Sequence, residues 1–132
     1  MTLRITGTGK LGEDIACLFL VKQGFSIVEQ NYNQKWGEID IVAKSKKGLY
    51  FIEVKAVTHE NNAYISRETD SFRPEDNVHS WKLKRLGRAI QTYLSEKRVS
   101  RDTSWKFGVI SVVLSLKDKK AQVKFLKDII LE

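Results

Sequence analysis

Two apolar segments joined by a short basic turn constrain the fold more than any other part of the sequence. The segments WGEIDIVAK (36–44) and GLYFIEVKAV (48–57) have the composition of β-strands, and SKKG (45–48) suits a hairpin turn between them. Within them the runs IVA and LYFI are almost continuously apolar, which is typical of strands that are covered on both faces. We therefore expect a central sheet with helices packed on its two sides.

The rest of the chain supplies helices and further strands for this sheet. Its 132 residues are the usual size of one domain, so we expect a single domain over residues 1–132. Gly24 is well placed to end the first helix. The predicted order αβββαββ defines an α/β fold with a central mixed β-sheet flanked by helices. The other predicted elements are a helix over 11–24, a strand over 25–33, a long polar segment over 58–73, a helix from between Pro74 and Ser80 to near Arg98, and strands over 105–116 and 121–130.

Charge and cysteine content narrow the classes of partner. The net charge of +7 favours a polyanionic partner such as nucleic acid, although a generally basic surface that keeps the protein soluble explains it equally well. The single cysteine, Cys17, excludes an internal disulfide and a Cys-based metal cluster. No apolar run approaches the length of a membrane span, and the amino terminus lacks the apolar core of a signal peptide. We expect a cytoplasmic protein without a membrane partner.

Charged side chains interrupt both strands of the hairpin, in each case two residues apart. Alternate residues of a strand share one face, so Glu38 and Asp40 should project together, as should Glu53 and Lys55 on the next strand. If the two strands pair, three carboxylates and one ammonium gather on one side of the sheet. Such charges beside a hydrophobic interior are unfavourable unless they are paired, hydrated or bound to a metal.

These charged pairs have two interpretations. The first is an exposed sheet face with cross-strand ion pairs. The second is metal-assisted hydrolysis of a phosphodiester, because carboxylates are ligands for Mg²⁺ and a nearby ammonium can stabilise charge on the phosphate or orient a water. The apolar flanks favour the second. Strand alternation also predicts that Ile39 and Ile41 point away from the charges into one apolar layer.

The order of these residues resembles the PD-(D/E)xK nuclease superfamily, in which an Asp precedes Glu-x-Lys on the next strand. Here Asp40 is followed by Glu53-Val54-Lys55. More narrowly, GEDIA, GEIDIVA, FIEVKA and KxxRLxxAxxxYL resemble the YraN family of small bacterial endonucleases, which is similar to archaeal Holliday junction resolvases. The resemblance covers residues 9–113. It implies a restriction-endonuclease-like fold, Mg²⁺ or Mn²⁺ as cofactor, and DNA as substrate, in branched or otherwise structured form.

The resemblance also implies roles for individual residues. Asp40 would be the central metal ligand and Glu53 the second, with the carbonyl of Val54 completing the inner shell. Lys55 would hold the nucleophilic water or the scissile phosphate. Glu13, on the first helix, matches the acidic residue that junction resolvases place beside the metal. The alternative for Glu13 is a solvated carboxylate near the amino-terminal turn, where the helix dipole favours it.

Other positions near the motif differ from the family or play a supporting part. Glu38 shares the expected face of Asp40 and is predicted to support the site rather than to bind the metal. Val57 and Asn33 stand where the family usually has Arg, and Gly108 stands where an Asp is common. Lys35 lies close enough to Asn33 in sequence to compensate. These departures affect the grip on the substrate more than the metal core.

Basic residues beside the second helix are candidate contacts to nucleic acid, since they could neutralise backbone phosphates. Their alternative is a solvated helix face opposite the predicted apolar stripe of this helix, which consists of Leu83, Leu86, Ile90, Tyr93 and Leu94. A symmetric homodimer would suit cleavage of two strands of a junction. Two other functions are a nucleic-acid-binding module without turnover and a scaffold with a basic surface. The predicted contacts are Lys35, Lys82, Lys84, Arg85 and Arg88.

Overall fold

The computed structural model describes residues 7–58 and 80–129, and it confirms the predicted α/β order of helix, three strands, helix and two strands. The described strands form one five-stranded sheet in the order β1-β2-β3-β4-β5. β3 and β4 are parallel, whereas the other neighbouring pairs are antiparallel. The elements are α1 (Gly7–Lys22), β1 (Ser26–Gln34), β2 (Gly37–Ser45), β3 (Gly48–Thr58), α3 (Ser80–Glu96), β4 (Trp105–Ser115) and β5 (Lys120–Ile129).

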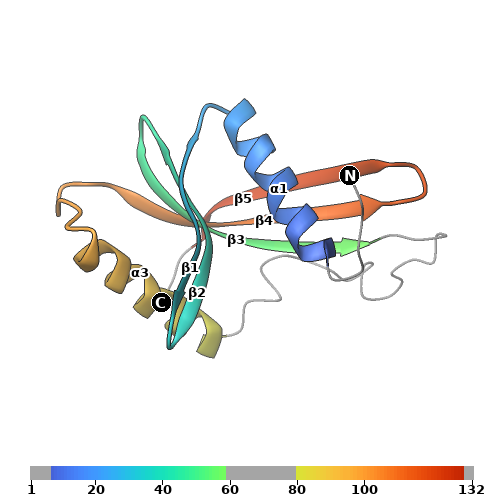
Figure 1. Cartoon of the computed structure of the whole chain (residues 1–132). Helices are drawn as coiled ribbons and strands as arrows, with labels where there is room; N and C mark the ends of the chain where they lie inside the picture. The colour runs from blue at the N-terminus through green and yellow to red at the C-terminus, as the bar shows by residue number, and fades with distance from the viewer. Residues whose placement is uncertain (1–6, 59–79, 130–132) are drawn as a thin grey trace.

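The sheet is covered on both faces, as the apolar runs predicted. α1 and α3 lie on opposite sides of it (Figure 1). Because strand residues alternate, Phe51 and Val109 belong to the core beside α3, while Ile52 and Ile110 belong to the core beside α1. A parallel pair of strands needs a long crossover, usually through a helix, and α3 lies in the connection from β3 to β4.

The first helix begins earlier than its apolar pattern predicted. α1 starts at Gly7 rather than at Leu11 and ends at Lys22. Gly24 adopts a positive φ of 97°, and the amide of Phe25 donates to a carbonyl in the last turn, so the predicted helix end is confirmed. The first turn therefore contains no acidic residue, and Glu13 lies beyond it. The dipole explanation of Glu13 is wrong for this reason.

The second helix packs through the predicted apolar stripe. Leu86, Ile90 and Tyr93 are buried against the sheet. The predicted polar segment from residue 59 onward and the part of the predicted helix start that precedes Ser80 lie outside the described residues. In the part of the chain that the structure describes, neither helix has the length and hydropathy to span a bilayer.

The hairpin strand β2 separates from β3 at Asp40. β2 pairs with β3 only from Ile41 to its end at Ser45, whereas its pairs with β1 lie on both sides of Asp40, from Gly37 to Ile39 and from Ile41 to Lys44. Asn31, which the register places opposite Asp40, has a positive φ of 53°. The expectation that Ile39 and Ile41 share one apolar layer is wrong. Ile39 packs beside α3 and Ile41 beside α1, because strand alternation does not continue across this irregular point.

α1 approaches the sheet closely at Gly12. A Cβ atom placed on Gly12 would lie 2.5 Å from the Cβ of Ala56 in β3, and that neighbour cannot rotate away. Gly12 therefore lets the helix backbone lie against β3. The same contact sets how far Glu13, the next residue of the helix, lies from the strands.

Substituting Gly12 by Ala should lower the free energy of unfolding by about 1–3 kcal/mol, because the added methyl overlaps β3. Gly9→Ala is the matched control in the same helix. A Cβ on Gly9 meets nothing within 4 Å, so this change should be neutral or stabilising by up to about 1 kcal/mol. Urea unfolding of both variants measures the difference. The double variant Gly12→Ala, Ala56→Gly should recover part of the loss, and no recovery would contradict the proposed overlap.

Candidate functional site: an acidic cluster between two central strands

Asp40 lies where β2 leaves β3, and its side chain bridges the opening. Its Oδ2 atom accepts a hydrogen bond of 2.7 Å from the backbone amide of Val54. The side chain thus takes the place of the strand-to-strand hydrogen bonds that end at the pair Ile41–Ile52. This arrangement holds the carboxyl of Asp40 beside the middle of β3.

Glu53 and Lys55 share one face of β3, as predicted. The Nζ atom of Lys55 lies 3.2 Å from Oε2 of Glu53. The Glu53 side chain is 8% exposed and that of Lys55 is 25% exposed, so the ammonium reaches the surface while the carboxylate is buried. Glu53 directly precedes Val54 in β3, and the amide of Val54 binds Asp40.

Asn31 joins the remaining two carboxylates of the cluster. With its Nδ2 atom facing them, it donates to Oε1 of Glu13 at 3.3 Å and to Oε2 of Glu38 at 3.0 Å. Sequence reasoning missed Asn31. The available signal was an asparagine inside a predicted strand, since Asn tolerates the left-handed conformation that this position adopts. The contact links β1 to α1 and β2 and brings Glu13 and Glu38 together.

The electrostatic surroundings of Asp40 are unusual for a carboxyl. The pKa of Asp40 is raised from 3.8 to about 7, and burial is the largest cause. The negative charges of Glu53, Glu13 and Glu38 also raise this pKa, whereas the hydrogen bond from Val54 opposes the shift. The other three carboxylates are therefore within electrostatic reach of Asp40. A shifted pKa caused by burial and like charges is a common property of functional sites.

Glu13 shows the same effect more weakly. Burial raises its pKa, the hydrogen bond from Asn31 opposes the shift, and the charge of Glu38 adds to it. Within the described residues, the cluster thus combines four carboxylates with the ammonium of Lys55. An added cation would lower the repulsion among the carboxylates.

The donor atoms of the cluster suit a small divalent cation. In residues 7–58 and 80–129, no three or more His, Cys, Asp or Glu side chains are grouped so that they could hold a metal by themselves. Mg²⁺ requires fewer protein ligands, since it takes one or two carboxylates and keeps several waters. Asp40, bound to the amide of Val54, and Glu53, the residue before Val54, meet this smaller requirement. The two carboxylates therefore fit Mg²⁺ or Mn²⁺, whose remaining coordination positions are filled by waters, better than a metal that needs three or more side-chain ligands.

The predicted basic contacts cluster at the tip of the β1–β2 hairpin and on α3. Arg85 donates from Nε to the carbonyl of Trp36, and the guanidinium of Arg88 lies 5.6 Å from the centroid of the Trp36 ring. Both arginines therefore attach the hairpin tip to α3, which is a structural role that the sequence did not reveal. The side chain of Lys82 lies outside the described residues. The predicted contacts with exposed side chains are Lys35, Lys84, Arg85 and Arg88.

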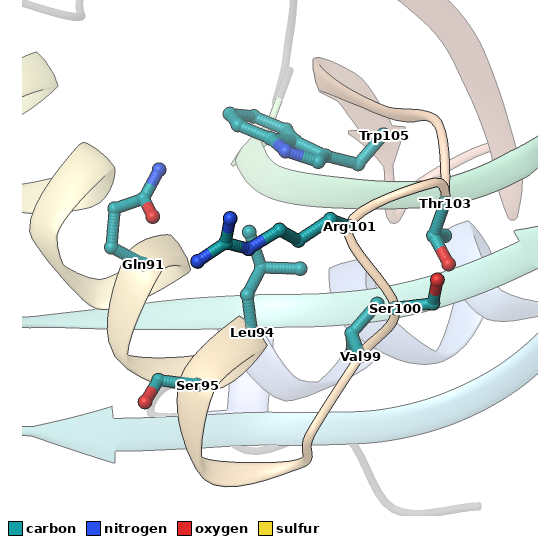
Figure 2. A pocket seen from close by; sticks show the side chains of 8 residues that line it. All are labelled: Gln91, Leu94, Ser95, Val99, Ser100, Arg101, Thr103 and Trp105. Atoms are coloured by element: carbon teal, nitrogen blue, oxygen red, sulfur yellow. The ribbon is translucent and has the colours of Figure 1, made fainter.

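A separate pocket of about 460 Å³ opens at the carboxyl end of α3 (Figure 2). Leu94 and Trp105 supply its apolar walls, and the side chain of Arg101 extends between α3 and Trp105. Trp105 pairs with Leu49, at the end of β3 that is remote from Lys55. None of the predicted site residues lines this pocket. It is therefore distinct from the acidic cluster.

The fold and the cluster define a class: α/β proteins with a mixed five-stranded sheet and a cluster of carboxylates where two central strands separate. Residues 12–112 match the family model described as "Uncharacterised protein family UPF0102". The chain belongs to this family. The matched range contains Glu13, Asn31, Glu38, Asp40, Glu53 and Lys55.

Relatives from several bacteria match most of the chain. A UPF0102 protein of Clostridium perfringens (strain SM101) is 37% identical over 121 residues, which cover 91% of this chain and 90% of the relative. A UPF0102 protein of Syntrophus aciditrophicus is 35% identical over 122 residues, covering 92% and 86%. A UPF0102 protein of Campylobacter jejuni subsp. doylei is 40% identical over 94 residues, covering 71% and 74%. The similarity therefore extends over most of the chain.

Proposed function

We propose that this protein is a metal-dependent endonuclease of the cytoplasm that hydrolyses phosphodiester bonds of DNA, including branched or otherwise structured DNA. The observation that carries the proposal is the 2.7 Å hydrogen bond that Asp40 accepts from the amide of Val54, the residue between Glu53 and Lys55, with the ammonium of Lys55 3.2 Å from Glu53. The order of these residues resembles the PD-(D/E)xK superfamily, and more narrowly the YraN family. The net charge of +7 and the exposed basic residues near α3 favour a polyanionic substrate.

Asp40, Glu53 and the carbonyl of Val54 would hold Mg²⁺ or Mn²⁺ in this function. The bound ion would polarise the scissile phosphate and lower the pKa of a coordinated water. Because a metal ligand must be deprotonated, the pKa of about 7 at Asp40 makes ion binding pH-dependent. Affinity for the ion should therefore increase as the pH rises through neutrality.

Lys55 would act on the substrate rather than on the ion. Its side chain is partly exposed and lies on the face of Glu53, so its ammonium can contact a phosphate that approaches the cluster. There it would stabilise the negative charge that develops in the transition state or orient the attacking water. Glu13 and Glu38, held by Asn31, would add negative potential beside the ion.

The wild-type protein is expected to cleave at least one member of a panel of single-stranded, duplex, flapped and four-way DNA in Mg²⁺ or Mn²⁺. Chelation by EDTA should abolish cleavage, because the proposed reaction requires the ion. Denaturing gels of end-labelled strands measure this, and RNA of the same sequences shows which nucleic acid is preferred. Gel filtration of the same preparation tests the predicted homodimer.

Two results would contradict the proposed activity. Binding without cleavage of any DNA or RNA in the panel, with either ion, would assign the protein to nucleic-acid-binding modules that lack turnover. Failure to bind any nucleic acid at low salt would contradict both functions, and the basic surface would then suit an acidic protein partner.

A further inference from the structure

The face that carries Glu53 and Lys55 continues as a polar row across the next two strands. The register of β3 and β4 places Lys55 opposite Ser111, and the register of β4 and β5 places Ser111 opposite Lys124. Opposed residues of neighbouring strands point to the same face, with Cβ atoms about 5 Å apart. Lys55, Ser111 and Lys124 therefore form one row across β3, β4 and β5.

The two cores of the protein confirm which face this row occupies. Ile110 and Val112, the neighbours of Ser111, belong to the core beside α1. Val123 and Phe125, the neighbours of Lys124, pack against the same core. Because strand residues alternate, Ser111 and Lys124 point to the opposite face, which they share with Glu53.

Nearer the start of β4 this face is apolar and covered by α3, and polar residues appear on it from the proposed site onward, interrupted by the pair Val57 and Val113. Phe107 and Val109 belong to the core beside α3. Two positions further along β4 comes Ser111, which is only 5% exposed and, with Glu53, is one of the two buried polar or charged residues in the described chain. Ser115 lies opposite Lys120 nearer the hairpin turn, so the pairing of serine with lysine is repeated on the same face.

We propose that Ser111 and Lys124 extend the site into a phosphate-binding track for the backbone of the nucleic acid. Hydroxyl and ammonium groups are donors that bind phosphate oxygens without reading sequence. Lys55 and Lys124 are two strand spacings apart, roughly 10 Å, which is far enough for them to contact different phosphates of one nucleic-acid strand. The track rests on the proposed function, since Lys55 would contact the scissile phosphate and Lys124 a phosphate further along the same strand.

Lys124→Gln and Lys127→Gln form a matched pair for testing the track. Both lysines are exposed residues of β5, but the Nζ of Lys127 lies 5.5 Å from the ring centroid of Phe125, on the α1 side of the sheet. Each substitution removes one charge, so a purely non-specific electrostatic effect would be equal. Affinity for a short fluorescent DNA duplex is measured by anisotropy in EDTA over a series of salt concentrations, which separates binding from cleavage.

Lys124→Gln should weaken binding about fivefold to tenfold at low salt and reduce the slope of log Kd against log salt by about 1. Lys127→Gln should leave the slope unchanged. Ser111→Ala should weaken binding about twofold to fivefold without changing the slope, because it removes a neutral donor. Equal effects of the two lysine substitutions, together with an unchanged affinity of Ser111→Ala, would overturn the track.

The track and the proposed nuclease activity fail in different ways. If the wild type cleaves DNA but Lys124→Gln binds and cleaves like Lys127→Gln, the track is overturned and the nuclease stands. If no ion supports cleavage but Lys124→Gln alone loses affinity and salt dependence, the nuclease is overturned and this face is a nucleic-acid-binding surface. Thermal unfolding of each variant verifies that the sheet is intact.

Discussion

Asp40→Asn should reduce metal-dependent cleavage by at least about 10²-fold, since it removes the proposed central ligand of the ion. The substitution is nearly isosteric, and an amide oxygen can still accept the hydrogen bond that Oδ2 accepts from Val54. Initial cleavage rates at saturating Mg²⁺ measure the effect on the best substrate of the panel. A folded variant that cleaves at the wild-type rate would contradict the role of Asp40.

The pH dependence of the free energy of unfolding supplies the folding control for this variant. The raised pKa of Asp40 determines whether stability rises or falls with pH. Below pH 4, Asp40 is protonated in both the folded and the unfolded chain. As the pH rises from about 4 to 7, the unfolded chain releases this proton while the folded protein keeps it, so the contribution of Asp40 to the free energy of unfolding falls and then levels off. Asp40→Asn lacks this loss.

The variant should therefore be at least as stable as the wild type above pH 7, and the difference should grow between pH 4 and 7. Urea unfolding at a series of pH values measures it. Added Mg²⁺ should raise the unfolding temperature of the wild type above pH 7 and have little effect on Asp40→Asn, because an ion that binds the folded state stabilises it. An equal response of both proteins to Mg²⁺ would place the ion elsewhere.

Lys55→Gln should also reduce cleavage by about 10²-fold, but for a different reason. It removes the charge proposed to act on the phosphate and leaves the carboxylates of Asp40 and Glu53 in place. The Mg²⁺-induced rise in unfolding temperature should therefore persist, in contrast to Asp40→Asn. Single-turnover rates and thermal unfolding with and without Mg²⁺ test the two parts separately.

Lys127→Gln is a suitable control for this substitution, because it removes a lysine from the other face of the sheet. Some loss of stability is expected in Lys55→Gln, since the buried carboxylate of Glu53 loses its 3.2 Å partner. Lys55→Arg keeps the positive charge and should be less impaired than Lys55→Gln. Equal cleavage by Lys55→Gln and Lys127→Gln would contradict a role of Lys55 at the phosphate.

Local sequence patterns determined the elements of the fold and the positions of the charged strand residues. The apolar runs of β2 and β3 predicted strands covered on both faces, and the helical spacing from Leu86 to Tyr93 predicted the buried stripe of α3. Because Glu53 and Lys55 are two residues apart, the sequence predicted that they share one face of the strand, where they form an ion pair. These features depend on neighbours in sequence, so periodicity is sufficient to predict them.

Tertiary structure decided how the carboxylates meet. The irregularity at Asn31 and Asp40 separates Ile39 from Ile41, and strict alternation could not have predicted it. The position of Glu13 depends on the contact of α1 with β3 through Gly12 and on the hydrogen bond from Asn31. Both contacts join segments that are distant along the chain.

The row from Lys55 to Lys124 shows the same division most clearly. The sequence by itself determined that β3, β4 and β5 are strands, and that alternate residues of each share a face. Only the tertiary structure decided that Ser111 lies opposite Lys55, because β3 and β4 are parallel and joined through α3. The register of such a pair is fixed by packing of the whole sheet and not by a local turn.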